Sequence, residues 1–333
     1  MNETFYTSSM RPATSFQPIR PTMNHQKGLH HITAFSGDGQ RNAEFYVYDL
    51  GLRLVLKSVN QDDPSIHHLF YANGSGAPGS SMTFFPIPRA TECRPGVGET
   101  NQVSFSVPEE SFDYWQDRLA EKGIEFEKPF ERFGLNVLRF KDPDNLQLEL
   151  VFDPQANKLQ TWADSTVPQE HGIRGFWSAN LLLQEEKSTA KILEEVLGFE
   201  KQSSEGNLNL YQSNSSIGHS LIIETVDQFT SGKTGRGSVH HVAFRSKDEE
   251  DSLQMREQLI QMGLQPTGII DRDVFKSVYF QTPGGVLFEI ATDGPGYASV
   301  VDYEEEMGKE LFLPPWYEKQ RNAIEQMLPE IKV

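Results

Sequence analysis

Apolar and polar side chains alternate along two stretches of this chain that read almost alike, GLHHITAFS at residues 28–36 and GSVHHVAFRS at residues 237–246. This alternation, together with β-branched and aromatic residues, predicts a β-strand in each stretch. Adjacent side chains on a regular strand point to opposite faces, so only one histidine of each pair is expected to line a cleft. Two copies of so unusual a strand indicate that one structural unit is used more than once.

Four units can be traced along the chain, and each predicts a strand, an amphipathic helix and three further strands. Every predicted helix is followed by a glycine and an apolar residue, as a left-handed C-terminal cap requires. These glycines are Gly51, Gly123, Gly198 and Gly263. The units run over residues 28–90, 99–153, 172–226 and 236–292. The sequence therefore predicts an α+β protein made of four βαβββ modules with curled mixed sheets.

The modules are expected to form two domains in chain order. A segment rich in Gln, Asp, Thr and Pro between the second and third units is typical of a linker. The first residues contain no apolar run of the kind found in secretion signals and are expected to form a mobile arm. A helix is predicted from about Tyr317 to Met327 and is expected to pack over an edge or a neighbour. The expected parts are an arm 1–27, an N-terminal domain 28–153, a linker 154–171, a C-terminal domain 172–295 and a tail 296–333.

Composition narrows the class of protein. The 333 residues carry a formal net charge of -17 at pH 7, so nucleic acid and anionic membrane surfaces would be repelled. No apolar run approaches the roughly 20 residues needed to cross a bilayer. A single cysteine, Cys93, excludes an intramolecular disulfide framework and favours a reducing cytoplasm. We expect a soluble cytoplasmic protein, and its uncovered sheet edges and C-terminal helix are compatible with a homodimer.

Counting along each unit locates candidate metal ligands. The residues 20 to 22 positions before the four helix-closing glycines are His31, Gln102, Trp177 and His241. The residues 26 positions after the last three of these glycines are Glu149, Glu224 and Glu289. In the first unit the turn proline places Phe84 at the matching position, six residues after Pro78. Each unit thus has one such position on its first strand and another on its last strand.

The first and fourth units together offer His31, His241 and Glu289. Two imidazoles and one carboxylate that leave other positions open are the facial triad of non-haem Fe(II) enzymes, although Zn²⁺ accepts the same donors. In the middle units glutamine is a poor iron ligand and tryptophan would crowd an ion, so no second working metal site is expected. The sequence predicts one metal cleft, built by the first and fourth units, and its ligand types leave the metal open.

The motifs LHHIT, VHHVAF and TPGGVLFEIAT, and the closing LPPWYEKQRNAIEQMLP, resemble the vicinal oxygen chelate superfamily over about residues 28–330. Within it they are similar to hydroquinone ring-cleaving dioxygenases and to bacterial candidate ring-cleaving dioxygenases linked to quinone resistance. The resemblance implies that Fe(II), with Mn or Zn as alternatives, is bound by His31, His241 and Glu289. It also implies active-site roles for four further residues, which are His30, His240, Arg272 and Tyr279.

The function that these features predict is Fe(II)-dependent opening of the ring of a small hydroquinone or catechol by O₂. A glyoxalase-type metal isomerase or thiol transferase is an alternative, although such enzymes commonly keep a fourth protein ligand where this chain is expected to have Phe84. A non-catalytic quinone-binding protein of the same fold is the second alternative. A further strand pair, His67 and His68, supplies one candidate to face the cleft.

Overall fold

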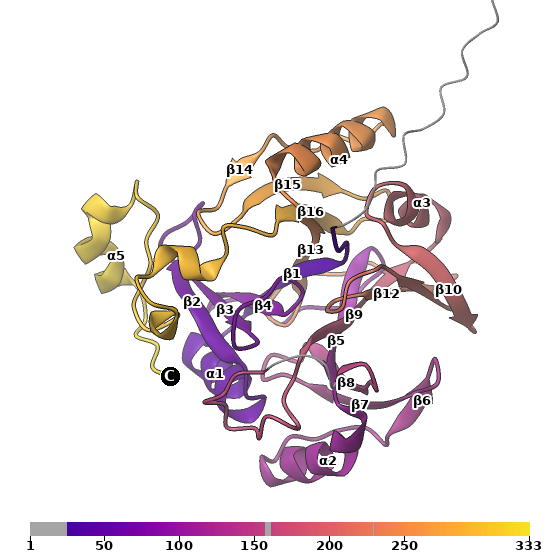
Figure 1. Ribbon diagram of the computed structural model, residues 1–333, viewed down its shortest axis with the longest axis horizontal. Coiled ribbons are helices and arrows are strands. Elements are labelled where there is room, and N and C mark those ends of the chain that lie inside the picture. The colour runs from indigo at the N-terminus through magenta and orange to yellow at the C-terminus, as the bar shows by residue number, and fades with distance from the viewer. Residues whose placement is uncertain (1–24, 157–160, 229) are drawn as a thin grey trace, which may run out of the picture.

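A computed structural model describes residues 25–156, 161–228 and 230–333 (Figure 1). The expected arm 1–27 lies almost wholly outside these residues. The first module consists of β1 (Leu29–Ser36), α1 (Gly39–Glu44), the π-helical turn η1 (Phe45–Asp49), β2 (Arg53–Val59), β3 (His67–Ala72) and β4 (Ser81–Pro86). The second consists of β5 (Glu99–Val107), η2 (Glu109–Ser111), α2 (Phe112–Glu121), β6 (Phe130–Arg132), β7 (Leu135–Lys141) and β8 (Gln147–Phe152).

The second half of the chain repeats this order. The third module consists of β9 (Gly175–Leu183), α3 (Lys187–Glu195), β10 (Glu200–Glu205), β11 (Leu208–Gln212) and β12 (Ser220–Thr225). The fourth consists of β13 (Val239–Ser246), α4 (Glu249–Gln261), β14 (Ile270–Asp271), β15 (Lys276–Gln281) and β16 (Leu287–Thr292). The tail contains short 3₁₀ turns, η4 (Tyr297–Val300), η5 (Glu304–Glu306) and η6 (Glu318–Gln320), and then α5 (Arg321–Met327).

The strands of the described residues form two curled eight-stranded sheets. One has the order β14-β15-β16-β13-β1-β4-β3-β2 and the other β10-β11-β12-β9-β5-β8-β7-β6. Both are mixed, because the first and last strands of a module pair in parallel while hairpin neighbours pair antiparallel. The predicted α+β fold with curled mixed sheets is confirmed. Each sheet combines modules across the expected domain boundary, the first with the fourth and the second with the third, and the division at 28–153 and 172–295 stays a prediction.

The helices α1 to α4 cover the outer faces of the sheets (Figure 1). Their apolar sides, including the fully buried Trp115, Leu119 and Leu259, join one large core with the outward-facing strand residues. All four predicted helix-closing glycines have positive φ, between 69° and 84°, so the predicted left-handed caps are confirmed. The inner faces of the two sheets are therefore the faces on which a cavity or a binding site can form.

The two edges of the first sheet approach each other and close its inner face into a cavity. Gln61, which follows β2, donates from Nε2 to Asp273 Oδ2 at 3.1 Å and accepts from Arg272 Nη1 at 3.0 Å. Both partners follow β14, the strand at the opposite edge. These contacts place a polar bridge over the inner face of the sheet.

The C-terminal tail extends β2 at this closing edge. Phe312 donates its backbone N–H to Lys57 O at 2.9 Å, and Lys57 pairs with Leu311 in a parallel bridge. Ile324 of α5 is buried against Val59 of β2, as expected for a packing helix that covers an edge. Among the described residues, no helix combines the length and the apolar character needed to cross a bilayer.

Candidate metal centre

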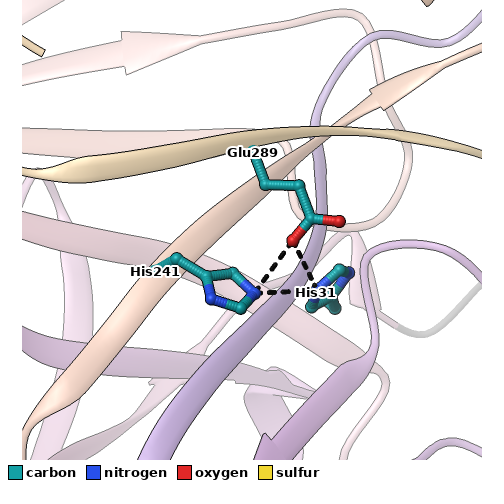
Figure 2. Close-up of side chains that lie close together, drawn as sticks. All are labelled: His31, His241 and Glu289. Carbon is teal, nitrogen blue, oxygen red and sulfur yellow. Dashed lines mark hydrogen bonds and ion pairs between the residues drawn. The ribbon is translucent and has the colours of Figure 1, made fainter. Parts of the chain in front are cut away.

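Three neighbouring strands of the first sheet bring two histidines and a glutamate to one point. β1 carries His31, β13 carries His241 and β16 carries Glu289, and all three residues are buried. His31 Nε2 and His241 Nε2 lie 3.2 Å apart, and Glu289 Oε2 lies 3.2 Å from the first and 2.9 Å from the second (Figure 2). In the described part of the chain, no other group of three or more His, Cys, Asp or Glu side chains converges in this way.

These separations fit a single metal ion. If each metal–ligand bond is about 2.1 Å long, ligand atoms 2.9 to 3.2 Å apart subtend about 87° to 99° at the ion. The three ligand atoms are therefore close enough together for one ion to contact all of them. The arrangement leaves the opposite face open for other ligands, as in a facial triad.

Both histidine pairs lie at β-bulges, and this corrects one expectation. The pairing of β1 with β13 contains one extra residue between Leu29 and Ile32, and another on β13 beside His240. The rings of His30 and His31 consequently lie on the same side, with their Nδ1 atoms 2.9 Å apart and both rings against Phe275. The expectation that adjacent histidines point to opposite faces is wrong here, because a bulge interrupts the regular alternation.

The outer histidines fix which nitrogen of each inner histidine carries the proton. His30 Nε2 lies 3.1 Å from the carbonyl of Thr292, which can only accept, so His30 carries its proton on Nε2. Burial, aided by His31, lowers the pKa of His30 to about 3, so the ring is neutral and its Nδ1 accepts from His31 Nδ1. His31 Nε2 then presents a lone pair. His240 and His241 repeat the Nδ1 contact at 2.8 Å.

The carboxylate completes the set of ligand groups. Burial alone would raise the pKa of Glu289, but the charges and hydrogen bonds of His31 and His241 outweigh it and hold this pKa well below its usual range. Ser277 Oγ donates to Glu289 Oε1, whereas the buried Oε2 contacts the two imidazole Nε2 atoms, at 2.9 and 3.2 Å. An ionised oxygen that faces two imidazole nitrogens in a buried place is a site that a cation would stabilise. The residues present therefore fit a divalent metal.

The fourth position of the site is occupied by Thr83, and the expectation of Phe84 is wrong. Glu289 pairs with Ala243, two residues after His241, and the matching pair in the first module is Thr33 with Thr83. Phe84 points into the outer core against Tyr46. The turn before β4 is one residue shorter than its counterpart, and a shift of one residue moves a side chain to the other face.

A chain of hydroxyl groups leads from this fourth position to a histidine that the sequence did not assign. Thr33 Oγ1 lies 2.9 Å from His241 Nε2 and 2.8 Å from Thr83 Oγ1. Thr83 Oγ1 in turn lies 2.9 Å from His68 Nε2. Burial lowers the pKa of His68 well below its usual value, so the ring is neutral at pH 7. Of the second histidine pair, His68 faces the cleft, whereas His67 contacts Pro329 O.

The corresponding place in the second sheet is filled by an ion-pair network. Glu149 is fully buried, and Arg132 and Arg139 both contact its carboxylate, with Arg139 Nη2 2.9 Å from Oε1. Ser104 Oγ donates to the other oxygen at 2.8 Å. Strand pairing also places Ser178, opposite Ser104, where the counting placed Trp177. Two guanidinium groups thus neutralise this carboxylate, and the expected lack of a second metal site agrees with this arrangement.

The metal centre opens into a cavity of about 470 Å³. Arg272 and Tyr279, singled out by resemblance, both line it, with the guanidinium 5.6 Å from the centre of the tyrosine ring. Burial raises the pKa of Tyr279, so its hydroxyl stays protonated. Other lining residues carried no motif in the sequence; they include Gln61, Phe275 and Phe312. Their segments follow strand ends or belong to the tail, where no periodic pattern predicts a position. The catalytic roles of His30, His240, Arg272 and Tyr279 stay predictions.

Comparison with known proteins identifies relatives along almost the whole chain. A model of the Glyoxalase/Bleomycin resistance protein/Dioxygenase superfamily matches residues 28–150 and 184–290. The MhqO protein of Bacillus subtilis, named as a candidate ring-cleaving dioxygenase, is 39% identical over 92% of this chain and 97% of its own length. The chlorohydroquinone/hydroquinone 1,2-dioxygenase of Sphingobium indicum is 30% identical over 90% of this chain and 94% of its own length.

Solved structures agree with these matches. A Bacillus subtilis protein described as a candidate dioxygenase superposes with a TM-score of 0.88 at 38% identity, covering 92% of this chain and 98% of that one. Glyoxalase I of Zea mays shares the fold, with a TM-score of 0.60 at 15% identity over 80% of this chain and 92% of that one. The resemblance inferred from the motifs is confirmed. The chain belongs to the glyoxalase/bleomycin resistance protein/dioxygenase superfamily.

Proposed function

We propose that this protein is an Fe(II)-dependent dioxygenase that opens the ring of a hydroquinone or catechol with O₂. The observation that carries the proposal is the facial arrangement of His31, His241 and Glu289 at the inner end of an aromatic-lined cavity. The names of the relatives support the reaction class, since MhqO is named as a candidate ring-cleaving dioxygenase and the Sphingobium indicum protein as a chlorohydroquinone/hydroquinone 1,2-dioxygenase. A cytoplasmic location and a homodimer stay predictions.

His31, His241 and Glu289 would hold the metal, and two imidazoles with one carboxylate are the ligand set of non-haem Fe(II) enzymes. When bound, Fe(II) supplies a Lewis acid for the substrate hydroxyl and a reaction partner for O₂. The protein supplies the orientation: His30 and His240 hold the inner imidazoles with Nδ1 protonated, so that Nε2 is available. Thr83 in place of a fourth protein ligand leaves room for substrate, which argues against the isomerase alternative.

Aromatic side chains form the seat for the ring. Phe275 stacks on His31 with ring centres 4.9 Å apart, and Phe35 and Phe85 lie against His240 on another wall of the cavity. Flat apolar walls orient a planar substrate and exclude water from the reacting atoms. The protonated Tyr279 hydroxyl is available as a hydrogen-bond donor to a substrate oxygen near His241.

The proton of the substrate hydroxyl needs an acceptor. His68 is neutral at pH 7 and is connected through Thr83 to Thr33, whose Oγ1 lies beside His241. A hydroxyl chain that ends on a neutral imidazole can relay this proton, and the lowered pKa of His68 lets the ring pass the proton on instead of retaining it. We assign His68 this role as acid–base residue. Arg272 is held by Gln61 and keeps a positive charge near the substrate oxygens.

The proposal is tested by oxygen consumption of the anaerobically Fe(II)-reconstituted protein with a panel of hydroquinones and catechols. We expect O₂ uptake in a 1:1 ratio with a ring-opened product, and loss of both uptake and retained iron in Glu289→Ala. Arg132→Met, which alters the buried carboxylate network of the second sheet, is the matched control and should retain iron. Iron-loaded protein that consumes no O₂ with any member of the panel would refute the proposed function.

A further inference from the structure

The cavity beside the metal centre extends well beyond the space that one aromatic ring needs. Its lining residues come from the central strands β1 and β13, which carry the buried His31 and His241, and also from β2 at the sheet edge. Leu56 of β2 and Phe312 of the tail are among them. We take the space beside the metal ligands as the inner part, which holds the reacting ring, and the space lined by Leu56 and Phe312 as the outer part.

The volumes set the size of this unused part. An engineered protein cavity of about 150 Å³ holds benzene, and a water-sized oxygen ligand occupies about 30 Å³. The cavity has a volume of about 470 Å³. A single ring with its two hydroxyl groups and O₂ therefore fills only about half of it. More than a methyl group or a single halogen is needed to occupy the rest.

The outer part of the cavity is suited to an apolar group. Leu56 and Val274 belong to one apolar cluster, and Phe312 packs against it. Arg272 and Asp62 are the charged lining residues apart from the histidines; Arg272 is assigned to the substrate oxygens, and the Asp62 side chain is 84% exposed to solvent. Water left against such a wall is displaced favourably by hydrocarbon, with about a fourfold gain in affinity for each methylene buried.

Phe312 is placed by the tail, which follows the last strand of the fourth module. Its backbone bond to Lys57 O holds it beside β2. The tail is secured next to the cavity mouth by a second contact, from the Tyr317 hydroxyl to Gln61 O at 3.0 Å. The wall for the second part of the substrate is therefore built separately from the metal centre and can vary without disturbing it.

We propose that the preferred substrates are hydroquinones that carry an apolar group larger than methyl or halogen, such as a branched alkyl chain or a second fused ring, and that Phe312 contacts this group. The proposal rests on the proposed function and names the substrate class of the same site. Phe312 acts as a specificity-determining residue. At about fourfold for each methylene buried against such a wall, a group of several carbons discriminates between substrates by well over tenfold.

The test compares hydroquinone, methylhydroquinone, tert-butylhydroquinone and 1,4-dihydroxynaphthalene. Steady-state kcat/KM is measured with the iron-loaded enzyme, and Kd is measured by calorimetry under strictly anaerobic conditions, where no turnover occurs. We expect both kcat/KM and affinity to improve at least tenfold from hydroquinone to the two bulkier compounds. Equal or better values for unsubstituted hydroquinone would overturn the inference while leaving ring cleavage intact. Absence of turnover with every compound would overturn the proposed function, and the Kd series would still decide the question of size.

Substitutions in the tail distinguish a direct contact between Phe312 and the substrate from a general disturbance of the tail. Phe312→Ala should reduce the preference for the bulky compounds at least tenfold, because their apolar group loses its wall. Phe312→Trp should reduce it as well, because the larger ring occupies the space. Trp316→Ala, an exposed aromatic position of the same tail, is the control and should leave the preference unchanged. An unchanged preference in both Phe312 variants, with thermal unfolding confirming that they fold, would contradict the assignment.

Discussion

Replacing His30 by phenylalanine tests whether the outer histidines prepare the metal ligands. In the native chain, Thr292 O fixes the proton of His30 on Nε2, and His30 Nδ1 accepts from His31 Nδ1. Without this acceptor, His31 is free to move its proton to Nε2, toward Glu289 Oε2 at 3.2 Å, and this tautomer cannot coordinate a metal. To bind the metal through Nε2, His31 must then carry its proton on Nδ1 again, where this buried N–H has no acceptor.

The magnitude follows from that unpaired donor. A buried group left without a hydrogen bond costs about 1–3 kcal/mol, and 1.4 kcal/mol corresponds to a tenfold change in affinity, so we expect metal affinity to fall about 10- to 100-fold. His240→Phe is the matched control: its Nδ1 makes the same contact with His241, but residue 240 is exposed and water can replace the acceptor. We expect less than about a fivefold loss there.

The assay is an anaerobic competition between the protein and a chromophoric chelator for Fe(II), with thermal unfolding measured alongside to exclude a general loss of structure. Equal losses of Fe(II) affinity in His30→Phe and His240→Phe would show that burial of the accepting histidine has no influence. Unchanged affinity in His30→Phe would refute the argument that the tautomer of His31 is set by its neighbour.

Three further predictions concern charge and backbone. Removing Arg132 leaves the buried Glu149 carboxylate with only part of its counter-charge. Arg132→Met should therefore lower the free energy of unfolding, measured by denaturant titration, by about 3 kcal/mol, and a change below about 1 kcal/mol would contradict the ion-pair assignment. The pKa of His30 is about 3 in the folded chain and near 6.5 when unfolded, so its contribution to the stability of metal-free protein is complete above pH 6.5 and declines as the pH falls toward 3, by on the order of 5 kcal/mol. His30→Phe should therefore reduce the slope of the free energy of unfolding against pH by about one proton. An unchanged slope would argue against the lowered pKa. Gly263 has φ +84° and open space where a Cβ would lie, so Gly263→Ala should cost about 1–2 kcal/mol through backbone strain alone, and a neutral effect on the thermal midpoint would exclude that strain.

The parts of the site that the sequence could predict are those tied to repetition. The same spacing recurs from helix cap to strand, and it located His31, His241 and Glu289, which the structure brings together. The error at Phe84 arose where a turn is one residue shorter, because alternation has period two and gives no warning of a shift by one. The bulges beside His30 could not be predicted either, since a bulge depends on the pairing of two strands 210 positions apart in the chain.

The positions of residues outside the repeated modules could not be predicted from the sequence, for a different reason. Gln61 and Phe312 reach the cavity because two sheet edges and the tail meet in space, and neither segment carries a periodic pattern of its own. Arg272 was singled out by resemblance, and its contact with Gln61 depends on the closure of the sheet. Sequence patterns describe single elements well, whereas these contacts arise from the way the elements curl.

The antiparallel pairing of β1 with β13 determines when the metal centre can form during synthesis of the chain. His31 is synthesised early, but its partners His241 and Glu289 leave the ribosome only after more than 200 further residues. A nascent or truncated chain carries half a coordination sphere and holds a redox-active ion poorly. Capture of the metal ion thus follows completion of a contact between residues 210 positions apart, so an unfinished chain does not hold the ion.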